Sequence, residues 1–145
     1  MNIIKNEDIE KGLNEKERLY LCGNLKFPNG VEHIPTEKYE IGISKYCDYN
    51  VNQPHYHSYN TEYNYVLEGE IKILLIGENK EFHFKKGDLF VINPFEEYVC
   101  KCLGDTKILF SKVPGGNDKV KLAITEEIKH WGRQWTNNDA KEVNE

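Results

Sequence analysis

A series of short apolar and aromatic runs between residues 18 and 113 constrains the fold more than any other feature of the chain. The runs are rich in Tyr, Phe, Val and Ile, and glycine, asparagine, proline or charged residues separate them. Because no helical pattern of useful length interrupts the series, a parallel sheet of alternating strands and helices is disfavoured. The turn signals recur at spacings typical of antiparallel sandwiches and barrels. We therefore predict an all-β domain.

The residues on either side of this series carry weaker patterns. We predict an N-terminal extension over residues 1–17 with a short helix, and a C-terminal tail over residues 114–145 with a second one. The second helix is expected to start at Thr125, because two acids and then an apolar stripe of Ile and Trp follow it. This division leaves residues 18–113 as one barrel, and a chain of 145 residues suits a single core.

Composition narrows the partners that the chain can have. It contains 24 acidic and 19 basic residues, and a net charge of -5 argues against nucleic acid, because phosphate binding needs a basic surface. No apolar run approaches the roughly 20 residues of a membrane span, and the first residues lack an apolar signal segment. The four cysteines show no C-x-x-C spacing. We therefore expect a cytoplasmic protein with reduced thiols and no membrane or nucleic-acid partner.

Three potential metal ligands lie close together in the chain. His55 and His57 share one face of an extended segment, because alternate residues of a strand point the same way. Glu62 begins the next strand after a short turn. Two imidazoles and a carboxylate can occupy neighbouring corners of one metal ion and leave other positions open for substrate or water. This donor set suits a divalent Fe, Mn, Ni, Co or Zn ion, and the pattern does not choose among them.

The spacing of these residues resembles the first conserved motif of the cupin superfamily. The pattern H-x-H-x4-E-x6-G covers residues 55–69, although Tyr49 stands where the family places a leading glycine. The resemblance implies a jelly-roll barrel of about six to eight strands with the site in its mouth. A second family motif is half present. Residues 87–94 match its glycine, apolar strand and proline turn, but Tyr98 stands where the family places a third metal histidine.

The missing histidine leaves the rest of the site open. Tyr98 can line the cavity as a phenol that hydrogen-bonds a substrate, or it can bind the metal if the ion lowers its pKa strongly. If Tyr98 points inward, strand alternation also turns Cys100 and Cys102 inward. There a thiolate would make a softer metal site, and a thiol would pack as a small apolar group. A metal-free cavity, in which the two histidines and the glutamate hydrogen-bond a ligand, is the remaining alternative.

The resemblance does not fix a reaction, because one fold supports many chemistries. Our leading hypothesis is a metal-dependent isomerase or epimerase acting on a small polar metabolite, a sugar or sugar phosphate. The metal would polarise a carbonyl, and Tyr98 or Glu62 would move the proton. The alternatives are an Fe(II)-dependent dioxygenase and a non-catalytic cupin that binds a ligand in the same pocket. We also expect a homodimer.

Overall fold

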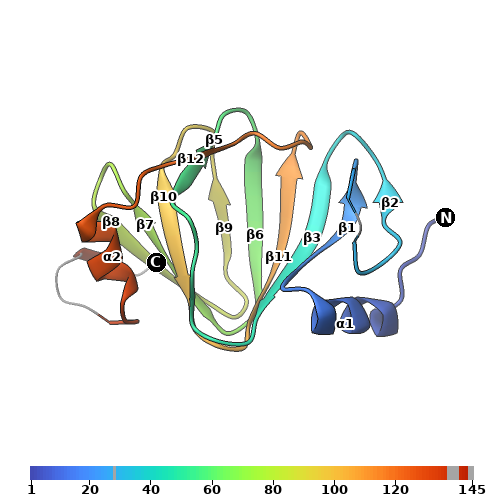
Figure 1. The fold of residues 1–145 in the computed structure, drawn as a ribbon, viewed down its shortest axis with the longest axis horizontal. Helices are drawn as coiled ribbons and strands as arrows, with labels where there is room; N and C mark the ends of the chain where they lie inside the picture. Colours follow the sequence, from blue (N-terminus) through green and yellow to red (C-terminus); the bar gives the residue numbers. More distant parts are fainter. Residues whose placement is uncertain (28, 137–140, 144–145) are drawn as a thin grey trace.

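The computed structural model describes residues 1–27, 29–136 and 141–143, and it confirms the predicted all-β, jelly-roll class (Figure 1). Two sheets face each other, and a short helix lies at each end of the chain. The first sheet contains, in spatial order, β2 (Ile34–Pro35), β1 (Arg18–Gly23), β3 (Glu40–Tyr46), β11 (Thr106–Val113), β6 (Thr61–Glu68) and β9 (Leu89–Ile92). The second contains β12 (Lys119–Lys121), β5 (His55–His57), β10 (Tyr98–Cys102), β7 (Glu70–Leu75), β8 (Lys80–Lys85) and β13 (Lys141–Val143), with β4 (Asn50–Val51) also paired to β10.

Alternate residues of the strands point into the space between the sheets. β6 shows this pattern clearly, since Glu62, Asn64 and Val66 are buried whereas Tyr63 and Tyr65 are exposed. The apolar inward residues pack into one core cluster, which contains Val66, Ile71, Ile73, Phe90, Ile92, Tyr98, Cys100, Cys102 and Ile108. The polar inward residues of β6 sit beside this core, where a polar group is costly unless it finds a partner.

The glycines of the two sequence motifs both occupy turns. Gly69 joins β6 to β7 with a φ of 78°, and a Cβ at this position would lie 2.6 Å from Cα of Thr106. Gly87 precedes β9 with a φ of 93°. Residues with a Cβ rarely adopt such a backbone conformation. Glycine at these positions therefore lets β6 pair correctly with its neighbours on both sides.

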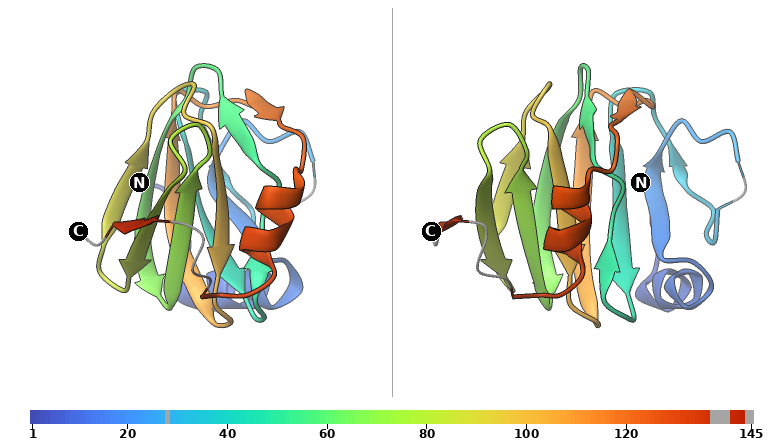
Figure 2. Two further views of the ribbon diagram at one scale, coloured as in Figure 1. Left: turned by 90° about the vertical axis from the view of Figure 1, so that its left-hand side faces the viewer. Right: turned by 60° about the vertical axis from the view of Figure 1, so that its left-hand side comes forward.

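The C-terminal helix, α2 (Glu126–Gly132), covers the outer face of the second sheet. It begins after Thr125, whose hydroxyl accepts a hydrogen bond from the backbone N–H of Ile128. Figure 2 shows the helix lying across the outside of this sheet. The buried apolar residues of this contact are Leu74, Val99, Ile128 and Trp131.

A fully buried lysine lies beneath this helix. Nζ of Lys101 donates hydrogen bonds to the carbonyl oxygens of Trp131, at 2.8 Å, and Gln134, at 3.0 Å. It also lies 3.7 Å from Oε1 of Glu81, which accepts a hydrogen bond from the Trp131 indole at 2.8 Å. A buried ammonium group is costly unless it is paired. These contacts therefore satisfy Lys101 and hold the end of α2 on the sheet.

The N-terminal helix, α1 (Asn6–Glu15), packs at one end of the first sheet. Its residue Leu13 joins Leu19 and Ile43 in a small apolar cluster. Neither this helix nor any other within the described ranges has the length and apolar character needed to cross a bilayer.

Candidate functional site

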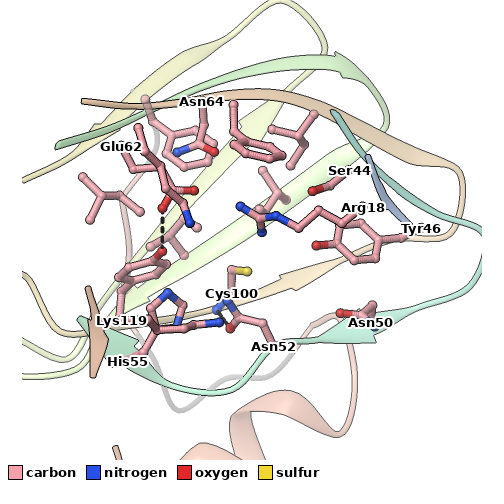
Figure 3. Close-up of a pocket in the computed structure, with 18 of the residues that line it drawn as sticks. Arg18, Ser44, Tyr46, Asn50, Asn52, His55, Glu62, Asn64, Cys100 and Lys119 are labelled. Atoms are coloured by element: carbon pink, nitrogen blue, oxygen red, sulfur yellow. Dashed lines mark hydrogen bonds between the residues drawn. The ribbon is translucent and has the colours of Figure 1, made fainter. Parts of the chain in front are cut away.

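A cavity of ≈ 380 Å³ opens between the two sheets and gathers the polar inward residues (Figure 3). Strand pairing explains why they meet, because cross-strand partners share one face of a sheet. The pairs that line the cavity are His55 with Tyr98, His57 with Lys119, and Glu62 with Lys112. In Figure 3, the guanidinium of Arg18 extends into the same space toward Glu62. Residues that are far apart in the chain therefore line the same cavity.

His55 presents one ring nitrogen to this cavity. Its Nδ1 lies 2.6 Å from the carbonyl oxygen of Gln53. A carbonyl only accepts hydrogen bonds, so Nδ1 carries the proton of this contact. Burial lowers the pKa of His55 to about 4, so the ring is neutral at physiological pH. Nε2 therefore keeps a free lone pair, which is the form in which imidazole binds a metal or accepts a proton.

His57 lies between two carboxylates. Nδ1 donates a hydrogen bond to Oδ1 of Asp118 at 2.8 Å, and Nε2 lies 3.0 Å from Oε2 of Glu62. Nε2 is buried and has no partner in hydrogen-bonding geometry. Burial acts to lower the pKa of His57, but the two carboxylates outweigh it and raise the pKa above its usual value. His57 is therefore held between two carboxylates, and its buried Nε2 lies against Glu62 at the cavity.

Asp118 is itself held rigidly. Its second oxygen, Oδ2, accepts the backbone N–H groups of Tyr59 at 2.8 Å and Asn60 at 2.7 Å. Burial would raise the pKa of Asp118, yet these two amides and His57 lower it. Asp118 is thus a fixed carboxylate that sets both the tautomer and the plane of the His57 ring.

Glu62 and Tyr98 have opposite protonation preferences. Burial alone would raise the pKa of Glu62, but His57, Arg18 and Lys112 lower it to about 2. Burial and the nearby Glu62 raise the pKa of Tyr98 well above its usual value. The Tyr98 hydroxyl lies 3.4 Å from Oε2 of Glu62 and donates to it. The pair is therefore an ionised carboxylate beside a neutral phenol.

The two cysteines of β10 also point inward. Cys100 lines the cavity, whereas Cys102 lies deeper in the core, at 1% exposure. The contact with Cys100 and burial together raise the pKa of Cys102. Cys102 is therefore a protonated thiol that packs as a small apolar group, which is the use that buried cysteines most often have.

His57 and Glu62 have the spacing of two neighbouring metal ligands. Two ligand atoms about 2.1 Å from an ion and at right angles to each other lie about 3.0 Å apart, and Nε2 and Oε2 are 3.0 Å apart. Nδ1 of both histidines is held by a second group, as is usual for ligating histidines. The other ring nitrogen of His57, Nε2, is buried and outside hydrogen-bonding geometry with Glu62. The donors therefore fit the divalent ion that the sequence motif implies.

The three candidate ligands lie near one another but do not form a complete metal site in the described residues. Within the described part of the chain, no three His, Cys, Asp or Glu side chains already form a metal-holding group. The ring centroids of His55 and His57 are 5.1 Å apart, and the rings are perpendicular. Joining His55 to the His57–Glu62 pair therefore needs a movement of a ring or of the carboxylate.

Four of the residues at this site were not expected from the sequence. Asp118, Arg18, Lys112 and Lys119 lie far from the histidine motif in the chain, and the pairing of strands alone brings them to it. Charged residues in strands are ordinarily read as solvent-facing. The one signal for Lys112 is the alternation of β11, which places it on the buried face of the strand with Phe110.

A known protein family matches the central part of the chain. Residues 49–111 match a family model described as the cupin domain. This match agrees with the paired sheets and with the inward placing of the motif residues. This match supports membership of the cupin superfamily for the central part of the chain. The matching segment holds the two histidines, Glu62 and Tyr98, but it ends before Lys112 and Asp118.

Solved structures share the fold of this chain at low sequence identity. KdgF from Halomonas sp. is 24% identical with a TM-score of 0.52, and the match covers 61% of this chain and 77% of that one. An uncharacterized conserved protein with a double-stranded β-helix domain from Klebsiella pneumoniae is 15% identical with a TM-score of 0.53, over 61% and 77% of the two chains. The polyketide cyclase RemF from Streptomyces resistomycificus is 14% identical with a TM-score of 0.62, over 92% and 94%. No curated protein sequence matches the chain.

Proposed function

We propose that this cupin is a metal-dependent isomerase or epimerase acting on a small polar metabolite, a sugar or a sugar phosphate. The observation that carries the proposal is the buried Nε2 of His57, which lies 3.0 Å from the Glu62 carboxylate, with the His55 ring beside it. A divalent ion bound by these three residues would act as a Lewis acid toward a substrate carbonyl.

The chain supplies the groups that move a proton. Tyr98 presents a hydroxyl that donates to Glu62 and can donate instead to a substrate oxygen. Oε2 of Glu62 contacts both His57 and Tyr98, which leaves Oε1 as the oxygen to take a proton from carbon. Because the low pKa of Glu62 makes it a weak base, that proton would have to be acidified by the bound ion. A donor and an acceptor on one side of a substrate are what proton transfer between neighbouring atoms requires. Asp118 keeps the His57 ring in place while this happens.

Metal content is the first test. Protein purified without added metal is expected to carry about one divalent ion per chain by elemental analysis. His55→Ala and Glu62→Ala should each reduce that content to background while the circular dichroism of the barrel is retained. His83→Ala is the matched control, because His83 pairs with Glu70 and does not line the cavity. Variants that retain as much metal as the wild type would overturn the ligand assignment.

Turnover is the second test. The metal-loaded protein is incubated with a panel of aldoses, ketoses and their phosphates, and interconversion is followed by NMR. We expect exchange of the proton beside the carbonyl with solvent deuterium for at least one member. Full metal loading with no exchange across the panel would contradict an isomerase or epimerase.

One observation favours a second candidate, a non-catalytic cupin that binds a ligand. Tyr98 occupies the place at which the family motif carries a third metal histidine, and losing a ligand is a simple way to lose chemistry. A thermal-shift screen that finds a tight ligand, recovered unaltered after long incubation with metal-loaded protein, would support this candidate. Any turnover of that ligand would exclude it.

A further inference from the structure

Three cationic residues lie where two cavities adjoin. The inner cavity of ≈ 380 Å³ contains His57 and Glu62, and a neighbouring outer cavity of ≈ 700 Å³ contains Tyr20 and Phe27. Arg18, Lys112 and Lys119 line both. A ligand that extends from the inner cavity into the outer one must therefore pass these three positive charges.

None of the three cations is neutralised by an ion pair with the described residues. Lys112 is only 8% exposed, and Nε of Arg18 is buried without a hydrogen-bond partner. The guanidinium of Arg18 instead lies over the Phe110 ring, 3.9 Å from its centroid. Charges in such positions are costly to keep without a counterion. No described side chain forms an ion pair with these three cations, which leaves their charge available to an anionic ligand.

The nearby carboxylates have other partners. Asp118 binds His57 and two backbone amides, and Glu62 contacts His57 and Tyr98. Glu40 accepts a hydrogen bond from the backbone N–H of Gly116 at 2.6 Å. Burial first, and then the charge of Arg18, lowers the pKa of both Lys112 and Lys119. The cations therefore act on one another, the charge of Glu62 offsets only part of this effect, and a divalent ion at the histidines would add further positive charge.

We infer that Arg18, Lys112 and Lys119 bind an oxyanion of the ligand, the phosphate or carboxylate of a sugar-sized metabolite. The reacting end of that metabolite then lies against His57, Glu62 and Tyr98, and the anionic group lies at the junction of the cavities. A planar guanidinium and two ammonium groups suit an oxyanion with several acceptor oxygens. This inference deepens the proposed function and rests on it for the reaction, whereas the anion binding itself is measurable without metal.

The test is isothermal titration calorimetry on chelator-treated protein, so that loss of metal does not affect the result. The probes are inorganic phosphate, glucose 6-phosphate, glucuronate and glucose. We expect at least one anionic sugar to bind about tenfold or more tightly than glucose, with affinity falling as salt rises. Tight binding of glucose 6-phosphate would identify a phosphate site, and tight binding of glucuronate a carboxylate site. If neither anion binds more tightly than glucose, the inference is wrong.

Substitutions of the cationic residues test where the anion binds. Lys119→Met and Arg18→Gln should each weaken the best anion by about tenfold and reduce its salt dependence, with glucose unaffected. Lys121→Met is the matched control, because it is an exposed lysine of the same strand and lines neither cavity. Since Lys119 is exposed at the rim, its variant should fold even if the Arg18 variant does not. An equal loss in Lys119→Met and Lys121→Met, or no loss in Lys119→Met, would contradict the assignment.

Discussion

At the scale of single residues, the site depends on how the two histidines are held. His55 is fixed by a neighbouring carbonyl, whereas His57 is fixed by Asp118, which lies 61 positions along the chain. Outer-shell partners of this kind set the tautomer and the angle of a ligating ring. Asp118 therefore contributes to the site without facing the ligand itself.

Replacing Asp118 tests this role. Asp118→Asn keeps the side-chain shape but turns an amide NH2 toward the N–H groups of Tyr59 or Asn60, or toward His57. We expect metal affinity to fall about 10- to 100-fold, measured by competition with a chelator. Asp105→Asn, in an exposed turn before β11, is the control and should have no effect. Unchanged affinity in Asp118→Asn would show that His57 needs no such support.

Removing the Tyr98 hydroxyl separates two roles for that residue. If Tyr98 donates protons, Tyr98→Phe should leave metal content unchanged and lower turnover by about 10²- to 10⁴-fold. Tyr46→Phe, another cavity phenol, should change turnover little. A parallel fall in metal content and turnover for Tyr98→Phe would instead make the phenol oxygen a metal ligand.

Residue patterns in the sequence account for only part of this arrangement. The His55, His57 and Glu62 spacing depends on strand alternation and one short turn, which are local properties that a sequence displays. Asp118 and Arg18 meet these residues through strand pairing over long separations, for which no local pattern exists. The inward position of Tyr98 follows from the second motif, but its contact with Glu62 depends on two sheets closing on each other.

At the scale of elements, α2 docks through a mixed apolar and charged contact. Its apolar stripe was visible in the sequence, but the buried Lys101 beneath it was not, because a lysine in a strand is ordinarily solvated. β10 is buried on both faces, with Tyr98 inward and Lys101 under the helix. The helix therefore supports the strand that carries Tyr98 from behind.

The contribution of this contact is measurable. Lys101→Met keeps most of the stem but removes the hydrogen bonds to Trp131 and Gln134 and leaves Glu81 without that charge partner. We expect a loss of about 3–5 kcal/mol in the free energy of unfolding, measured by urea denaturation. Lys121→Met should change it by less than about 0.5 kcal/mol. A loss in Lys101→Met as small as that of the control would mean that the buried network does not stabilise the fold.

The turn at Gly69 makes a second stability prediction. Gly69→Ala places a Cβ against Thr106 at a positive φ, so both the turn and the contact become strained. We expect a destabilisation of about 1–3 kcal/mol, read as a lower melting temperature. Gly77→Ala is the control, since a Cβ at Gly77 meets nothing within 4 Å. Equal melting temperatures for the two variants would contradict this explanation of the motif glycine.

At the scale of the whole molecule, the outer face of the first sheet carries an uncharged stripe. Tyr63 and Tyr65 of β6 lie opposite Val91 and Leu89 of the edge strand β9, and all four are exposed. A second copy of the chain can cover this stripe without burying a charge. We predict a homodimer formed through this face, with twice the chain mass of 17.0 kDa by light scattering.

A charge placed in the stripe should separate the subunits. Leu89→Glu is expected to give a monomer at micromolar concentration and to leave metal content unchanged. Val120→Glu, an exposed apolar residue on β12 away from this sheet, is the control. A monomeric wild type, or a dimer that survives Leu89→Glu, would rule out this interface.

Asp118 lies far along the chain from His57, and this separation determines how many residues are needed to keep the site intact. The segment that matches the family model, residues 49–111, contains both histidines and Glu62 but neither Asp118 nor Arg18. A minimal barrel cut at those limits, or a chimera that exchanges only that segment, would transfer the candidate metal ligands without the carboxylate that orients His57. Swapping chemistry between such barrels therefore requires exchanging the flanking strands together with the motif.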